Sequence, residues 1–132
     1  MIAIDTSALV SVLNKEPCAE RVLRCALDAD GVLMSGGTVL ELAIVVQAKW
    51  GTRGSALKVL LLDRLRVEPV DVDAQQVRLA IDAYSRYGRG TGSPARLNFG
   101  DCFAYALAKA RDLPLLFVGD DFVHTDLRQA LA

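Results

Sequence analysis

The stretch Asn98-Phe99-Gly100-Asp101-Cys102-Phe103-Ala104-Tyr105-Ala106-Leu107-Ala108-Lys109 places a single acid at the start of an otherwise almost wholly apolar segment. Gly100 loosens the backbone, and aspartate readily accepts hydrogen bonds from the free N–H groups of a first helical turn. Apolar residues then follow without interruption up to Lys109. We therefore predict a core helix with the Asp101 carboxylate at its end, pointing into a cleft. Asp101 viewed alone is equally well explained as a plain N-cap. A functional site at Asp101 therefore requires other acidic residues near it.

The composition favours one α/β domain, which we expect to span residues 1–132. The chain has 15 Lys and Arg against 16 Asp and Glu, so the net charge of −1 provides no global basic field for nucleic acid. Any such role must come from a local patch. The hydrophobic content of 52% is high, and indicates a well-filled core together with an apolar surface covered by a partner.

The expected location is the cytoplasm. No apolar run approaches the roughly 20 residues that cross a bilayer, and the opening Met1-Ile2-Ala3-Ile4-Asp5 is too short and too acidic for a signal peptide. The cysteines are odd in number (Cys18, Cys25 and Cys102), and the chain has one histidine and no Cys-x-x-Cys pair. This pattern argues against zinc and is typical of cysteines that pack as small hydrophobes.

Apolar runs and capping residues alternate along the chain as strands and helices do in an α/β protein. The strands are expected at residues 1–4, 32–35, 67–70 and 115–118, and the helices at residues 8–13, 18–29, 36–49, 56–65, 74–87, 98–109 and 127–131. Pro69 places the third strand near an edge, because proline cannot donate to a ladder. Strands separated by helices predict a mainly parallel sheet covered on both faces.

Two local charge patterns stand out. Glu41 is the only charge in an apolar helix, where a lone carboxylate is costly unless it is paired or compensated. The glycine-rich residues 85–100 carry Arg86, Arg89 and Arg96 and no acid, which makes them the one basic, flexible stretch. These arginines are candidates for phosphate contacts, although a merely solvated loop explains each of them as well.

Four acidic points are expected to converge on one cleft. Asp5 and the pair Asp120-Asp121 directly follow strands, Asp101 begins a helix, and Glu41 lies near the start of another. Ligands of parallel sheets bind at the carboxyl ends of the strands. Clustered carboxylates without histidine or thiolate suit a hard dication, Mg²⁺ or Mn²⁺, and such sites hydrolyse phosphodiesters.

Taken together, these motifs resemble the PIN-domain ribonucleases, and specifically the VapC-type toxins of bacterial toxin–antitoxin pairs. The resemblance covers nearly the whole chain. The matching segments are Ile4-Asp5-Thr6-Ser7-Ala8-Leu9, Glu41, Leu97-Asn98-Phe99-Gly100-Asp101-Cys102, Leu116-Phe117-Val118-Gly119-Asp120-Asp121-Phe122 and Thr125-Asp126. It implies a three-layer α/β/α sandwich and a Mg²⁺-dependent endoribonuclease that cuts structured RNA, commonly transfer RNA.

The resemblance also implies roles for individual residues and for partners. The catalytic and metal-binding acids would be Asp5, Glu41 and Asp101 with a fourth at Asp120 or Asp121, Asp120 being favoured. Thr6 and Ser7 would fix carboxylate rotamers by hydrogen bonding. The partners would be RNA, a VapB-like antitoxin that covers an apolar groove, and a second copy in a homodimer, a heterotetramer or a larger assembly with the antitoxin. No membrane partner is expected.

Other functions fit the sequence less well. A haloacid-dehalogenase phosphatase needs a second Asp two residues after the first, where this chain has Ser7. A receiver domain needs a lysine after the last strand, and residues 119–121 offer none. A non-catalytic interaction module with the same fold has no reason to bear the mutual repulsion of the acids.

Overall fold

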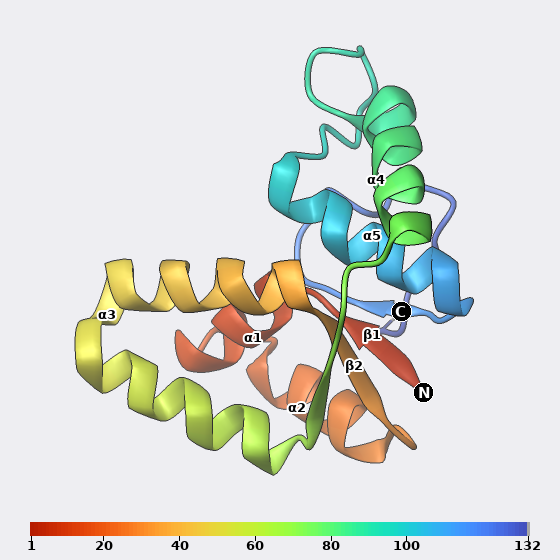
Figure 1. Ribbon diagram of the computed structural model, residues 1–132. Helices are drawn as coiled ribbons and strands as arrows, with labels where there is room; N and C mark the ends of the chain where they lie inside the picture. Colours follow the sequence, from red (N-terminus) through yellow and green to blue (C-terminus); the bar gives the residue numbers. More distant parts are fainter. Residues whose placement is uncertain (132) are drawn as a thin grey trace.

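The centre of the structure is a four-stranded parallel sheet with the strand order β3-β2-β1-β4 (Figure 1). A computed structural model describes residues 1–131. The strands are β1 Ile2–Ile4, β2 Val32–Ser35, β3 Val67–Val70 and β4 Leu115–Leu116. The strand that carries Pro69, β3, is an edge strand, as predicted, and Ile4 pairs with Leu116 at the carboxyl end of the sheet.

Helices cover both faces of this sheet and make the predicted three-layer sandwich. They are α1 Thr6–Leu13, α2 Ala19–Asp28, α3 Gly36–Arg64, α4 Ala74–Tyr87 and α5 Phe99–Arg111. In Figure 1, α1, α2 and α3 lie on one side of the strands, and α4 and α5 lie on the other.

The alternation of side chains along the strands divides the core into two halves. Ala3, Leu33 and Leu115 face the α4 and α5 side, where they join a cluster around buried Tyr105. The next residue of each strand faces α1, α2 and α3 in a second cluster that includes Ile4, Met34 and Leu116. Both faces of the sheet are therefore packed, and its carboxyl edge is left to carry polar side chains.

Helix α3 is a long helix with one sharp break, where the sequence predicts two helices separated by a turn over residues 50–54. The break is confined to Gly51, which has φ 62° and ψ −150°. This conformation is open to glycine and strained for other residues. It reverses the chain, so the second half of α3 runs back at an angle to the first (Figure 1).

The helix predicted over residues 127–131 is wrong. Gln129 instead forms an isolated parallel bridge with Leu115. The Leu115 N–H donates to the Arg128 carbonyl at 2.9 Å, and the Ala130 N–H donates to the Leu115 carbonyl at 2.9 Å. The outer edge of β4 would otherwise bury unpaired backbone groups, and this pairing outweighs the weak helical pattern.

The last strand is also shorter than predicted, because β4 ends at Leu116 and residues 117–118 leave the ladder.

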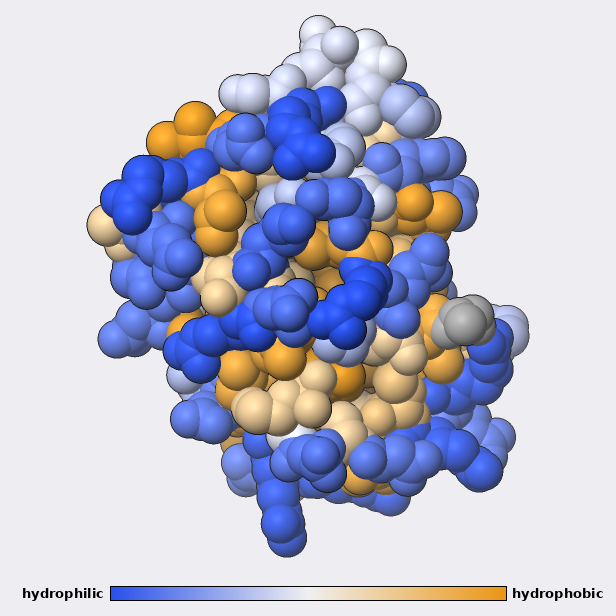
Figure 2. All heavy atoms as spheres, turned by 90° about the vertical axis from the view of Figure 1, so that its right-hand side faces the viewer, coloured by the Kyte–Doolittle hydropathy of each residue, from blue (hydrophilic) through white to orange (hydrophobic). Residues whose placement is uncertain are grey.

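The surface on the side of the two chain ends has patches of apolar residues that are separated by hydrophilic ones (Figure 2). Within residues 1–131, no helix is both long enough and apolar enough to cross a membrane.

Candidate active site

Asp5 lies at the carboxyl end of β1, where it is the N-cap of α1. Its Oδ2 accepts hydrogen bonds from the Ser7 N–H at 3.0 Å and the Ser7 hydroxyl at 2.7 Å. The residue is 3% exposed, and its Oδ1 is buried with no hydrogen-bond partner. Burial raises the pKa of Asp5 to about 6; the Ser7 hydrogen bonds act against this rise, and the negative charge of Glu41 adds to it.

Asp101 occupies the first turn of α5, but the N-cap of that helix is Asn98. The Asn98 side chain accepts from the Asp101 N–H at 2.9 Å, and Asp101 Oδ2 accepts from the Asn98 N–H at 3.0 Å. This reciprocal capping box fixes the carboxylate at the helix end. The Asn-x-x-Asp spacing is its signal in the sequence, and the prediction that treats Asp101 itself as a candidate N-cap overlooks it.

The surroundings of Asp101 indicate which acids are its neighbours. Burial is the largest cause that raises the pKa of Asp101 to about 7, against the opposing hydrogen bond from Asn98. The negative charges of Asp5, Asp121 and Glu41 raise it further, in that order. Carboxylates at the end of β1, on α3 and in the segment after β4 therefore all act electrostatically on Asp101 of α5.

Glu41 reaches this group of acids from the second turn of α3. Its Oε1 accepts a hydrogen bond of 2.6 Å from the Thr6 hydroxyl. Its Oε2 lies against the backbone of Gly100, one residue before Asp101. The half-buried Glu41 side chain thus bridges the first turns of α1 and α5.

Thr6 and Ser7 link the acids to one another and to the sheet. Thr6 donates to Glu41, while Ser7 donates to Asp5. The Ser7 hydroxyl oxygen also accepts a hydrogen bond of 3.0 Å from the N–H of Val118, two residues beyond the end of β4. Each hydroxyl therefore orients one carboxylate, and Ser7 in addition ties that carboxylate to the neighbouring chain segment.

Asp120 and Asp121 are both exposed and follow Gly119, whose φ of +107° turns the chain after β4. Asp121 raises the pKa of Asp101, and Asp120 is not among the causes of that shift. The next residue, Phe122, is buried and packs on Phe117 with ring centroids 5.2 Å apart. Of the two acids, Asp121 thus has the stronger electrostatic link to the group.

Asp126 fixes the segment that contains Asp120 and Asp121 to helix α5. Its carboxylate accepts from the buried Tyr105 hydroxyl at 2.7 Å and from the Lys109 ammonium at 2.9 Å, both on α5. Arg86 lies 3.9 Å from the same carboxylate. The sequence does not predict this contact, since no local pattern brings Tyr105 and Asp126 together.

The three arginines predicted to contact RNA differ in their surroundings. Arg86 lies 3.4 Å from Asp82 and stacks 4.8 Å from the centre of the Tyr87 ring, so its guanidinium is engaged within the chain. Arg89 and Arg96 are exposed on the loop that leads into α5. The Arg89 N–H donates to the Leu97 carbonyl at 3.0 Å, which closes this loop next to the start of α5.

The donors at this site fit a hard divalent cation. They are carboxylate oxygens, one of them is buried and unpaired, and two of the carboxylic acids have raised pKa values that a cation would lower. Among residues 1–131, however, no three Asp, Glu, His or Cys side chains lie close enough together to form a ready-made metal site. Each carboxylate is instead turned toward its own hydroxyl or N–H donor, and like charges favour this separation.

Comparisons with known proteins identify the family to which this chain belongs. The family model described as "PIN domain" matches residues 2–127. VapC ribonuclease Mb0640 of Mycobacterium bovis is 48% identical over 127 residues, covering 96% of this chain and 95% of the relative. Ribonuclease VapC42 of Mycobacterium tuberculosis is 45% identical over 128 residues, covering 96% of this chain and 97% of the relative.

Solved structures show the same fold. VapC20 of Mycobacterium tuberculosis, described as a sarcin–ricin loop cleaving toxin, superposes with a TM-score of 0.76 at 17% identity over 96% of each chain. A chain of VapBC2 from Rickettsia felis, bound to a DNA fragment from its promoter, superposes with a TM-score of 0.73 at 18% identity, covering 98% of this chain and 97% of that one.

Proposed function

This chain belongs to the PIN-domain family, among the VapC ribonuclease toxins of toxin–antitoxin systems, and we propose that it is a Mg²⁺-dependent endoribonuclease neutralised by a VapB-like antitoxin. Mn²⁺ is a second candidate metal, because it favours the same oxygen donors. PIN-domain ribonucleases generally use divalent metal ions, which supports the metal part of the proposal.

Two observations support the proposal most strongly. The Oδ1 atom of Asp5 is buried without a hydrogen-bond partner, and burial together with the neighbouring acids raises the pKa of Asp101. Burying an acceptor without a partner costs free energy, and so does placing negative charges close together. A structural role for these acids would not offset either cost. A divalent cation held by Asp5 and Asp101 would offset both, since it would supply a partner for the free oxygen and neutralise the charges.

Asp5, Glu41 and Asp101 would hold the cation, with a fourth carboxylate from the segment after β4. We keep Asp120 as a candidate but favour Asp121, because its charge acts on Asp101. The chemistry that Mg²⁺ would supply is polarisation of the phosphate, a lowered pKa of a water molecule and neutralisation of charge on the leaving oxygen.

The other residues of the site would orient these carboxylates and the substrate. Thr6 and Ser7 restrict the rotamers of Glu41 and Asp5 through the hydrogen bonds described above. Arg89 and Arg96 are exposed and free to approach a phosphate backbone, whereas Arg86 would first have to leave Asp82 and Asp126. The substrate we propose is structured RNA, with transfer RNA as the first candidate.

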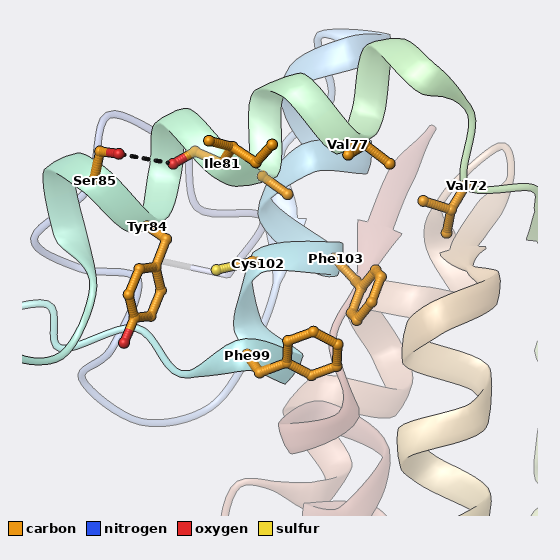
Figure 3. A pocket seen from close by; sticks show the side chains of 9 residues that line it. Val72, Val77, Ile81, Tyr84, Ser85, Phe99, Cys102 and Phe103 are labelled. Carbon is orange, nitrogen blue, oxygen red and sulfur yellow. Dashed lines mark hydrogen bonds between the residues drawn. The ribbon is translucent and has the colours of Figure 1, made fainter.

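An exposed apolar groove next to the acids is the proposed surface for a second copy of the chain. It has a volume of about 660 Å³, and Figure 3 shows Val77 and Ile81 of α4 on one side and Phe99 and Phe103 of α5 on the other. Phe99 is 79% exposed and packs edge-on against Phe103. All the residues that line the groove are uncharged, so its natural complement is another apolar face.

The resemblance implies an antitoxin that covers an apolar groove; we assign the groove described above to the second copy and propose that the antitoxin approaches the acids themselves. A basic side chain placed beside Asp5 and Asp101 would compensate the same charges as the cation does and so exclude it. Solved relatives include VapBC complexes, which supports an antitoxin partner. The assembly would be a heterotetramer or a larger complex built on the toxin homodimer.

Cleavage of purified cellular RNA tests the proposal. Discrete fragments should appear with Mg²⁺ and disappear with EDTA. Asp101→Asn should also prevent cleavage, although the asparagine oxygen can still accept the Asn98 N–H and keep the helix cap. Asp63→Asn is the matched control, because Asp63 is exposed at the far end of α3 and should leave cleavage unchanged. Metal-independent cleavage, or full activity of Asp101→Asn, would refute the assignment.

A further inference from the structure

The carboxylate of Glu41 occupies the space in which residue 100 would carry a side chain. A Cβ built on Gly100 would overlap Glu41 Oε2, and it would lie 2.5 Å from the carboxyl carbon and 3.0 Å from Oε1. Real Cβ atoms do not make such contacts. Any residue other than glycine at position 100 therefore requires Glu41 to move.

The backbone gives no separate reason for a glycine at this position. Gly100 lies within α5, and the described glycines with positive φ are Gly51, Gly90, Gly92 and Gly119. Alanine in a helix is more stable than glycine by roughly 0.5–1 kcal/mol. On backbone grounds alone, Gly100→Ala should thus be neutral or stabilising.

The other side of the same carboxylate is held by Thr6, whose hydroxyl donates to Oε1 at 2.6 Å. Glu41 is therefore enclosed between the first turn of α1 and the first turn of α5. Its side chain is flexible, so displacing the carboxylate costs little packing. What displacement removes is the defined place of the carboxylate between Thr6 and the backbone of Gly100.

We propose that Gly100 is a positioning residue: its missing side chain admits the Glu41 carboxylate to the acidic group and, with Thr6, fixes where that carboxylate lies. The consequence for metal affinity rests on the proposed function. The consequence for the Thr6–Glu41 hydrogen bond does not, and it can be measured on the metal-free protein.

The test uses Gly100→Ala with Gly36→Ala as the matched control, since a Cβ at Gly36 meets only the Val70 carbonyl at an ordinary 3.5 Å. In the crystal structure of metal-free Gly100→Ala, the Thr6–Glu41 hydrogen bond should be lost. Mn²⁺ affinity, measured by calorimetry, should fall by about 10-fold or more. The Tm should be no lower than that of Gly36→Ala, because a displaced carboxylate does not disturb the core.

A double-mutant cycle separates positioning from a general effect of the substitution. Glu41→Asp withdraws the carboxylate by one methylene, so Gly100→Ala should weaken Mn²⁺ binding far less in that background than in the wild type. Additive losses would overturn the proposal, as would an intact Thr6–Glu41 bond in Gly100→Ala or a fall in Tm that accompanies the loss of binding. A wild type that does not bind Mn²⁺ would refute the proposed metal function, while the crystal structure of the variant would still decide the role of Gly100.

Discussion

The hydroxyl of Thr6 donates a 2.6 Å hydrogen bond to Oε1 of Glu41, which lies 35 positions further along the chain. Thr6 is buried in the first turn of α1, and Glu41 projects from α3. This contact fixes the rotamer of Glu41. Within residues 1–131, Glu41 forms no salt bridge. The position of the carboxylate is thus set by an uncharged residue.

Thr6→Val should lower the RNA cleavage rate by about 10- to 100-fold, because valine keeps the shape of threonine but cannot donate to Glu41. Thr6→Ser keeps the hydroxyl and should retain most of the activity. Single-turnover cleavage of a defined RNA fragment measures both variants. Equal rates for Thr6→Val and the wild type would show that the hydrogen bond does not position Glu41.

Ser7→Ala should destabilise the protein by about 1–3 kcal/mol, since it leaves the Val118 N–H without its acceptor and removes the hydroxyl contact of the Asp5 carboxylate. Urea unfolding followed by circular dichroism gives the free energy of unfolding. Ser85→Ala is the control, because the exposed Ser85 hydroxyl only donates to a carbonyl within α4. A loss no larger than that of Ser85→Ala would contradict the bridging role of Ser7.

The metal-free protein should lose stability as the pH rises from 5 to 8. The pKa values of Asp5 and Asp101 are raised in the folded state from 3.8 to about 6 and about 7, so between these limits the folded protein binds more protons than the unfolded chain does. The stability that these two carboxyl groups contribute is therefore fully present at a pH below 3.8, their pKa in the unfolded chain. It falls as the pH rises through about 6 and about 7, their pKa values in the folded protein.

Urea unfolding in EDTA at pH 5 and pH 8 measures this dependence. Asp5→Asn removes one of the two titrating groups, so its loss of stability over that range should be smaller than that of the wild type by about 1–2 kcal/mol. Mg²⁺ should remove most of the remaining dependence by stabilising the ionised carboxylates. Identical pH profiles for the wild type and Asp5→Asn would contradict the burial of an ionisable Asp5.

Ile81→Glu should convert the proposed homodimer into a monomer. Ile81 is 63% exposed at the apolar groove, so a glutamate there leaves the fold intact but places a charge in the interface. Light scattering should give the 14.2 kDa mass of one chain for the variant and twice that mass for the wild type. Glu20→Ala, at an exposed position of α2, is a control that should remain dimeric. A wild type that is monomeric at high concentration would refute the dimer.

The features of the fold that the sequence predicts are those that depend on the residues of one short segment. Asp5 directly follows a buried apolar run, and α4 spans residues 74–87, as the sequence predicts. The two-sided packing follows from β1, β2 and β4, which are buried along their whole length. Gly51 breaks α3 within the predicted turn, although the other residues of that turn keep helical backbone angles.

The features that escaped prediction depend on contacts between distant segments. The chain around Gln129 pairs with Leu115 because a strand edge is free there, which residues 127–131 do not reveal. Likewise, Gly100 in sequence indicates only a loosened backbone, whereas its role in the structure comes from Glu41 on another helix. The choice between Asp120 and Asp121 stays a prediction: the resemblance favours Asp120, whereas of the two only Asp121 is among the charges that raise the pKa of Asp101.

Calorimetric titration of the metal-free protein with Mn²⁺ tests the central claim most directly, because it asks whether the acids bind a cation without requiring the correct RNA. Wild type and Asp63→Asn should bind with equal affinity, and Asp101→Asn should bind at least about 10-fold more weakly while keeping its folded circular dichroism spectrum. Undetectable binding by a folded wild type, or equal binding by Asp101→Asn, would contradict a metal site built on Asp5, Glu41 and Asp101.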